Sequence, residues 1–388
     1  MYYSIFPTKT TYISSGSHVD TGVDQKDQNF GGSEVLELKK VFKTLTFDHH
    51  TRMLLQFNLN ETGNSISQSI VEGKIPNPNA VGSSAAKYYL RLYETEGNKE
   101  LSEEYKIGFY PISESWQQGI GKSFDSPKTT EGVSWTARSD YPGASAVGWT
   151  QGGTQVTAGG SFLDNDDSGS VQSFDRTTSS DINVNITTMV KKWLQGGVEN
   201  HGVIAKFSGS QETDTTTFGH LNFFSKETNT VYSPKLEVRW DDHTSITGDN
   251  TGSLTQLTMS GADNLLYIKG LRDKYKETEK VRFQVGARKR YIQKTFSTSV
   301  QTVGGSYVPE KSGSYSIVDI STNEAVVPFK DNEDNCYSYL SCDTNGMYFE
   351  QWLNTFHPGR TYKILLKLDM DDGQEIIYDD NWEFKIVN

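Results

Sequence analysis

The apolar positions of residues 181–207 change their period partway along the segment. Ile182, Val184 and Ile186 alternate with polar residues, which predicts a strand with one buried face. The apolar residues that follow have the spacing of a short amphipathic helix: Ile186, Met189, Val190, Trp193 and Leu194. The pair Gly196-Gly197 predicts the end of that helix, because glycine adopts the left-handed conformation common at helix C-termini. A second strand is predicted over 202–207.

The other apolar stretches mostly alternate with polar residues, and this period predicts an all-β protein. Strands are expected at 12–13, 35–38, 52–59, 88–93, 105–112 and 235–240. A hydrophilic linker is predicted at 243–253, between an N-terminal sandwich at 1–242 and a second β domain at 254–388. We expect the first domain to be a jelly-roll-like β-sandwich with one short helix.

The C-terminal residues predict a small immunoglobulin-like sandwich. Apolar residues alternate from Tyr362 to Leu368 and from Trp382 to Ile386, and Asp371-Asp372-Gly373 between them predicts a tight hairpin. A Pro-Gly turn precedes Tyr362, which opens the first of these strands. Immunoglobulin-like domains place a tyrosine at such a corner, where its hydroxyl bonds to nearby backbone.

Composition limits the functions that this fold can have. A chain of 388 residues is too long for one ordinary core, and its net charge of −12 is unfavourable for general nucleic-acid binding. The sequence contains no run of eighteen apolar residues, so no membrane-spanning segment is predicted. The first residues show no basic region followed by an apolar stretch, so we expect no signal peptide. The chain contains only two cysteines, Cys336 and Cys342, and this low number also suits folding in a reducing cytoplasm.

A series of short motifs resembles the DNRLRE-type domains, which are β-sandwiches related to carbohydrate-binding modules. The motifs follow the family's order along the first 240 residues: Asn29-Phe-Gly-Gly32, Arg52-Met-Leu-Leu55, Leu90-Arg-Leu-Tyr93, Glu114-Ser-Trp116, Gly159-Gly160, Val190-Lys-Lys-Trp193 and Ser233-Pro-Lys-Leu-Glu-Val238. The ending, with Gly346-Met-Tyr-Phe349, is similar to virion proteins of tailed bacteriophages. These resemblances imply a virion protein that is assembled in the host cytoplasm.

One acidic segment has the spacing of a calcium-binding loop. Asp164, Asp166, Ser168 and Asp175 offer oxygen ligands at alternating positions, and Gly169 occupies the sixth position. No helices are expected to flank the segment, and Asp175 replaces the usual glutamate. A structural calcium site is therefore one interpretation and a solvated turn is the other. No other cofactor is indicated.

Three tryptophans in a Gly/Ser-rich region could stack against sugars. Trp116 and Trp135 belong to family motifs, and we expect them to be packing anchors. Trp149 has no such motif, so it is the candidate for an exposed glycan-stacking residue.

The acidic chain contains a basic island at 272–294. This segment contains nine Lys and Arg residues and three acidic residues, which gives it a net charge of +6. The island is either a solvated strand pair that balances local acids or a docking face for an acidic partner. The docking interpretation selects Arg288, Arg290 and Lys294, with Arg288 and Arg290 on one strand face and Lys289 on the other.

Two functions remain from the sequence. The first is a non-catalytic structural component of a virion, attached to a capsid, neck or tail through protein–protein contacts and present as a homo-oligomer, ring or array. The second is an adhesion module that binds cell-surface glycans. No nucleophile elbow or phosphate-binding loop is present, and no carboxylate pair is singled out, so no enzyme is expected. We expect neither a nucleic-acid nor a membrane partner.

Overall fold

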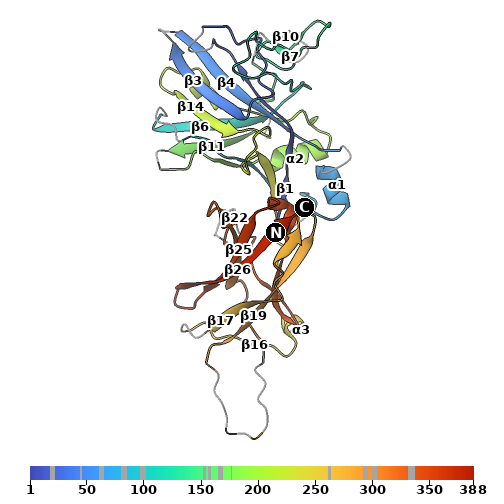
Figure 1. The fold of residues 1–388 in the computed structure, drawn as a ribbon, viewed down its shortest axis with the longest axis vertical. Coiled ribbons are helices and arrows are strands. Elements are labelled where there is room, and N and C mark those ends of the chain that lie inside the picture. Colours follow the sequence, from blue (N-terminus) through green and yellow to red (C-terminus); the bar gives the residue numbers. More distant parts are fainter. Residues whose placement is uncertain are drawn as a thin grey trace. The chain divides into compact units, whose positions relative to one another are not determined.

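The computed structural model describes residues 1–388 except 18–21, 44–45, 61–64, 80–84, 97–101, 152–153, 156–158, 165–168, 176, 261–263, 292–295, 297, 299–303 and 331–336. Of 42–43, 46–48, 151 and 154–155 it describes the backbone alone. Within these limits the chain is nearly all β, as the alternating pattern predicts (Figure 1). The chain divides into an N-terminal unit (Ser4–Ala80 and Ala86–Val238) and a C-terminal unit (Met1–Tyr3, Val81–Ala85 and Arg239–Asn388).

The N-terminal unit contains a small and a large sheet. The small sheet has the order β1 (Tyr2–Ile5), β15 (Lys235–Arg239), β5 (Lys87–Leu92) and β12 (Ile182–Asn185). The first two residues of β1 and the last residue of β15 are counted with the C-terminal unit. The large sheet has the order β11 (Ser170–Asp175), β6 (Glu104–Pro111), β13 (Val203–Phe207), β4 (Thr46–Phe57), β3 (Val35–Lys43) and β14 (Gly219–Phe224), and β2 (Pro7–Ser14) pairs with β4. Two short hairpins join β7 (Ala137–Ser139) to β8 (Val147–Gly148) and β9 (Thr150–Gln151) to β10 (Thr154–Gln155). These sheets contain all the strands expected in this part of the chain.

The large sheet buries apolar residues on both faces. Consecutive strand residues point to opposite faces, yet Met53, Leu54 and Leu55 of β4 are all buried. Leu54 packs with Ile13 and Ile204 of neighbouring strands in a cluster that contains the tryptophans of the 111–162 region. We call this the outer face of the large sheet, and described residues of the 111–162 region cover it.

Helix α2 (Thr187–Leu194) confirms the change of period in the sequence. Its buried residues are Met189, Val190 and Trp193, and Gly196 follows it with a φ of +73°. The strands predicted on either side are β12 and β13. The expectation of one helix in this domain is wrong, because helix α1 (Ile66–Val71) also forms; Ser65 caps it by accepting a hydrogen bond from the backbone N–H of Gln68.

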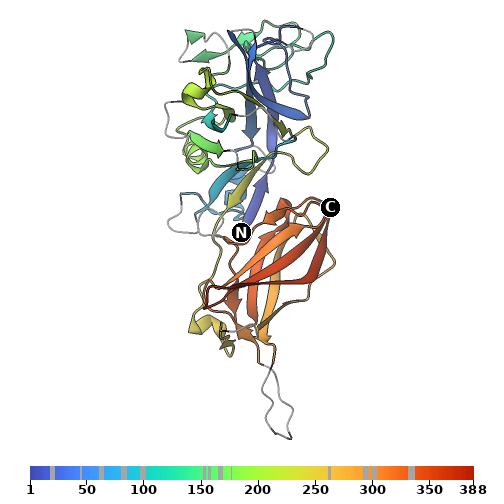
Figure 2. The same cartoon turned by 90° about the vertical axis from the view of Figure 1, so that its left-hand side faces the viewer.

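The C-terminal unit is a two-layer sandwich, visible as the orange and red strands of Figure 2. One sheet has the order β16 (Thr255–Gln256), β20 (Ser306–Tyr307), β19 (Lys280–Lys289), β24 (Gly346–Trp352) and β23 (Ser341–Asp343), and β17 (Asn264–Lys269) pairs with β19. The other has the order β18 (Lys274–Lys276), β26 (Glu375–Val387), β25 (Thr361–Asp369), β21 (Gly313–Asp319) and β22 (Ala325–Val327). The pairings β17-β19-β24-β23 and β26-β25-β21 reproduce the ABED and GFC sheets of an immunoglobulin-like sandwich.

The tyrosine corner predicted from the sequence is present. Tyr362 is buried at the start of β25, and its hydroxyl accepts a hydrogen bond of 2.8 Å from the backbone N–H of His357. Gly373 forms the predicted hairpin between β25 and β26 with a φ of +80°. This corner fixes the path of the chain into β25.

The segment predicted as a linker, 243–253, packs on the C-terminal unit. It contains the short helix α3 (Gly248–Thr251), and Ile246 packs against the core of that unit. The backbone N–H of Ile246 also donates to the Glu310 carboxylate at 2.6 Å. The hydrophilic composition of this segment gave no indication that it contacts the C-terminal unit.

The first residues belong to the C-terminal unit, which the sequence did not predict. Tyr2 is buried in the core of that unit. Its carbonyl accepts a hydrogen bond of 2.7 Å from the side chain of Gln351 on β24. The C-terminal core is therefore completed by residues from the other end of the chain.

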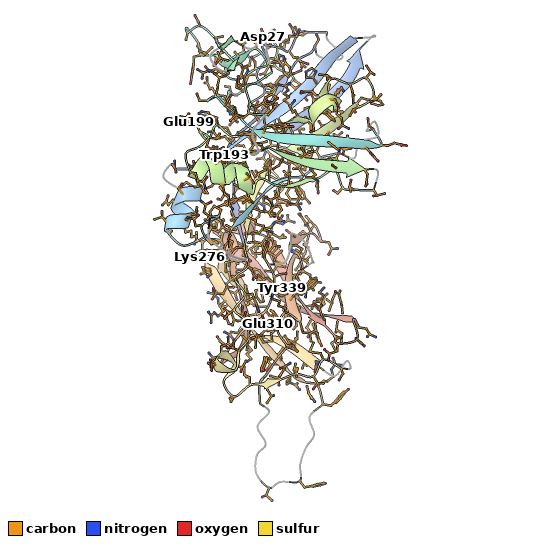
Figure 3. The ribbon with its side chains drawn as sticks, turned by 180° about the vertical axis from the view of Figure 1, so that it is seen from behind. Asp27, Trp193, Glu199, Lys276, Glu310 and Tyr339 are labelled. Atoms are coloured by element: carbon orange, nitrogen blue, oxygen red, sulfur yellow. The ribbon has the colours of Figure 1, made fainter. Side chains whose placement is uncertain are left out.

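Trp193 lies on α2 (Figure 3). We predict that Trp193→Ala lowers the free energy of unfolding of the N-terminal unit by about 3–5 kcal/mol, because the residue is 2% exposed and its truncation leaves a cavity. Calorimetry should show the loss in one transition only, while the C-terminal unit melts as before. Val71→Ala is the control, since Val71 is 86% exposed on α1. Equal effects of both substitutions would contradict the buried position of Trp193.

We predict that Tyr362→Phe destabilises the C-terminal unit by about 1 kcal/mol, because the N–H of His357 loses its hydroxyl acceptor. Urea unfolding with a probe in this unit measures the effect. Tyr291→Phe, at an exposed tyrosine of the same unit, should leave the midpoint unchanged. A midpoint that is equally unchanged for Tyr362→Phe would mean that the corner bond does not stabilise the fold.

Candidate functional site

The predicted glycan-stacking residue is buried, so this prediction is wrong. Trp149 is 0% exposed and packs in the cluster on the outer face of the large sheet. Its indole N–H donates to the carbonyl of Ser134 at 3.1 Å. The sequence was misleading because a Gly/Ser-rich region usually predicts an exposed loop, whereas this region covers apolar residues of the sheet.

Trp116 and Trp135 are packing anchors, as predicted. Both are buried in the same cluster as Trp149. Trp116 donates to the carbonyl of His201 at 2.8 Å, so its polar atom is satisfied inside the protein. None of these three indoles offers a face for a sugar.

The predicted calcium ligands are only partly described. Asp166 and Ser168 lie outside the described residues. Asp164 lies in an exposed bend, and Asp175 ends strand β11, so the last residues of the pattern are extended rather than looped. Calcium binding stays a prediction.

The carboxylate of Asp175 already has partners in its own turn. It accepts hydrogen bonds from the backbone N–H groups of Thr177 and Thr178 at 2.8 and 2.9 Å. Bonds from Thr177, followed by those from Thr178, hold the pKa of Asp175 below its ordinary value. Among the described residues, no group of three or more His, Cys, Asp or Glu side chains is placed to hold a metal ion.

The first half of the basic island is neutralised by acidic neighbours. Arg282 on β19 pairs with Glu350 at 2.8 Å and with Asp343 at 3.1 Å. Lys280 also pairs with Glu350, at 2.5 Å. Arg272 pairs with Glu279 at 2.7 Å in the same way. For these residues the structure matches the interpretation of a solvated strand pair.

The predicted docking residues lie at the end of β19. Arg288 is opposite Leu265 of β17 and shares the outward face with Arg282, whereas Lys289 is the next residue of the strand. Arg290 follows the strand and is exposed, and Lys294 lies outside the described residues. Arg288 donates to the carbonyl of Lys289 at 3.1 Å. Arg288 and Lys289 are consecutive residues of β19, so their side chains point to opposite faces of the strand, as predicted.

A buried ion cluster on the outer face of the large sheet was not predicted. Glu212 is 7% exposed, and its carboxylate accepts hydrogen bonds from Arg52 at 2.7 and 3.0 Å and from Lys206 at 2.6 Å. The guanidinium of Arg52 also lies 5.0 Å from the ring centre of Trp135. Positive residues in the apolar strands 52–57 and 203–207 were the signal that could have indicated this cluster.

The cluster holds Glu212 in its charged form. Burial by itself would raise the pKa of Glu212, but the charges and hydrogen bonds of Arg52 and Lys206 together lower it. Each partner of a buried ion pair would be costly alone, because the interior does not solvate an unpaired charge. The cluster therefore stabilises the segments that cover the outer face of the large sheet. Its carboxylate, that of Glu212, is engaged by Arg52 and Lys206 and is not available as a catalytic acid.

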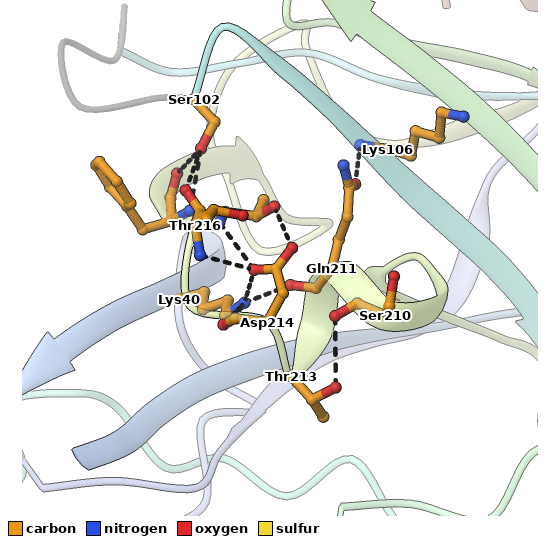
Figure 4. Close-up of polar contacts among 10 residues, drawn as sticks. Lys40, Ser102, Lys106, Ser210, Gln211, Thr213, Asp214 and Thr216 are labelled. Atoms are coloured by element: carbon orange, nitrogen blue, oxygen red, sulfur yellow. Dashed lines mark hydrogen bonds and ion pairs between the residues drawn. The ribbon is translucent and has the colours of Figure 1, made fainter.

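Another buried cation, Lys40, organises the segment between β13 and β14 (Figure 4). The ammonium group of Lys40 donates to the carboxylate and to the carbonyl of Asp214, both at 2.9 Å, and to the carbonyl of Gln211. Thr217 donates to the same carboxylate from its N–H at 2.8 Å and from its hydroxyl at 2.7 Å. Burial opposes ionisation of Asp214, but bonds from Lys40 and Thr217 lower its pKa strongly. This network also serves the fold.

No protein-family model matches this chain, and no curated protein matches it. The similarity to DNRLRE-type domains and to phage virion proteins therefore remains a resemblance of short motifs. None of the helices in the described part of the chain is long and apolar enough to cross a membrane.

We predict that Glu212→Gln destabilises the N-terminal unit by about 3 kcal/mol at pH 7, because the buried Lys206 and the largely buried Arg52 lose their counterion. A carboxylate with a lowered pKa stabilises the fold above its ordinary pKa of 4.5, and this contribution is lost as the pH falls through the lower folded value. The difference between wild type and variant should therefore shrink in acid. Urea unfolding from pH 7 to pH 3 measures it.

The control for this experiment is Glu199→Gln, since the side chain of Glu199 is 86% exposed. We expect its unfolding free energy to stay within about 0.5 kcal/mol of wild type. A pH-independent difference for Glu212→Gln would contradict an ionised Glu212 in the folded protein.

Proposed function

We propose that this protein is a non-catalytic structural component of a bacteriophage virion, attached to the capsid, neck or tail through protein–protein contacts. The observation that carries the proposal is that the strongest candidate site groups are used inside the fold. Trp149 packs under the cover of the large sheet, and Glu212 and Asp214 are held by buried cations. The assignment to a virion comes from the motif resemblances, and the all-β sandwich architecture agrees with it.

The end of β19 supports docking to an acidic partner protein. Arg288 and Arg290 follow the neutralised part of the basic island, and Arg290 is exposed. Arginine forks pair with carboxylates in two parallel hydrogen bonds, which favours a specific contact over a diffuse attraction.

A second candidate function is glycan binding by the C-terminal unit. Tyr348 and Trp352 are half-buried on the outward face of β24, since Met347, Phe349 and Gln351 between and beside them point into the core. Aromatic rings that are half-exposed on a strand face can stack on sugars. Arg282 lies 4.0 Å from the ring centre of Tyr348, however, and covers part of that ring. We therefore place this function second.

The test is mass spectrometry of purified particles, combined with variants of the full chain. We predict that wild type is a stoichiometric particle component and that Arg288→Glu/Arg290→Glu lowers its incorporation about tenfold, through charge repulsion by the acidic partner. Lys289→Glu is the matched control and should have a smaller effect. Circular dichroism confirms that each variant is folded.

Absence of the wild-type protein from purified particles would reject the virion assignment. Presence of wild type with normal incorporation of the double variant would place the docking surface elsewhere. Binding of the purified chain to a glycan array, lost in Trp352→Ala, would favour the second function.

A further inference from the structure

The two sheets of the N-terminal unit meet at a boundary between two edge strands. Strand β12 is the last strand of the small sheet, and β11 is the last strand of the large sheet. The two strands follow one another in the chain and lie side by side. We call the side of β12 that faces away from β5 the β12 edge. A strand edge presents a row of backbone N–H and C=O groups that can pair with another chain.

The side chain of Gln172 on β11 bonds the β12 edge as a strand residue would. Its amide NH₂ donates to the carbonyl of Asp181 at 3.0 Å, and its amide oxygen accepts from the backbone N–H of Asn183 at 2.8 Å. One residue of a parallel strand also bonds two residues of its neighbour through its N–H and its C=O. The side-chain amide therefore occupies backbone groups that an added strand would need.

Other contacts hold β11 in the position from which Gln172 reaches the β12 edge. The hydroxyl of Ser170 donates to the carbonyl of Asn185 at 2.7 Å, at the other end of β12. All residues of β11 pair with β6, and the ring of Phe174 stacks on that of Tyr105 with 4.8 Å between their centres. Gln172 thus projects from a strand that is fixed along its whole length.

The β12 edge is complementary to a second copy of itself. The N–H and C=O of one strand residue point to the same side, so the bond from Asn183 to Gln172 places both backbone groups of Asn183 on the β12 edge. Two such edges related by a twofold axis can pair antiparallel, because each supplies donors and acceptors to the other. Asn183 and Asn185 are exposed, so the edge lies close to the protein surface. A second copy is therefore the partner that an unprotected β12 edge fits.

We infer that Gln172, with the help of Ser170, protects the β12 edge against strand addition by a second copy of this chain. Proteins commonly protect sheet edges with charges, prolines, bulges or a covering segment. Here a side-chain amide from the neighbouring sheet satisfies the edge directly. The protection does not depend on the proposed function, whose docking residues belong to the C-terminal unit.

The test compares the self-association of the full chain as wild type and as Gln172→Val, by sedimentation velocity over a range of concentrations. Valine keeps a strong strand preference at position 172 but neither donates nor accepts a hydrogen bond. We expect Gln172→Val to self-associate at about tenfold lower concentration than wild type, because an N–H and a carbonyl of the edge lose their partner. The matched control is Ser173→Val, which adds the same side chain at the next, exposed position of β11 and should associate as wild type does.

A second variant, Gln172→Lys, separates loss of protection from loss of stability. Lysine cannot accept a hydrogen bond from Asn183, but a charge at a strand edge opposes pairing with another chain. We expect Gln172→Lys to remain in the association state of wild type. Its Asn183 N–H should exchange with deuterium about tenfold faster than in wild type, since the amide oxygen that holds this hydrogen is absent. In associated Gln172→Val the same N–H should be protected again.

Several outcomes would overturn the inference. Unchanged self-association of folded Gln172→Val would leave Gln172 as a contact that only stabilises the sandwich. Equal association of the valine and lysine variants would attribute it to lost stability, and association without renewed protection of Asn183 would place the contact on another surface. An unchanged exchange rate of Asn183 in Gln172→Lys would reject the inference even if Gln172→Val does not fold.

Discussion

The large sheet of the N-terminal unit buries apolar residues on both faces, and this constraint governs much of the structure. A strand such as β4, with Met53, Leu54 and Leu55 in succession, cannot leave either face in water without exposing large apolar side chains. The small sheet and its helix cannot cover both faces, so the 111–162 region covers the outer one. The burial of Trp116, Trp135 and Trp149 follows directly from this need.

The same cover explains the buried ion cluster. Arg52 and Lys206 lie on strands whose outer face is closed to water, so each requires a counterion or acceptors inside the protein. Glu212 supplies the counterion from a short 3₁₀ turn that follows β13. Such a cluster makes one arrangement of the covering segments favourable over others, because any other arrangement would leave a buried charge unpaired.

A rigid support also characterises the surface proposed for docking. Arg288 lies on a strand of the immunoglobulin-like sandwich. A contact side chain held in this way binds with a small entropic cost.

Local patterns in the sequence determined the all-β class, helix α2 with its buried Trp193, the hairpin at Gly373 and the tyrosine corner at Tyr362. Each depends on residues close together in the chain, so hydrophobic period and turn chemistry are sufficient to predict it. Only the tertiary structure decided that Trp149 is buried, that Tyr2 completes the C-terminal core, and that Glu212 meets Arg52. These outcomes depend on contacts between residues far apart in the sequence, and local composition carries no information about which distant segment will cover a given face.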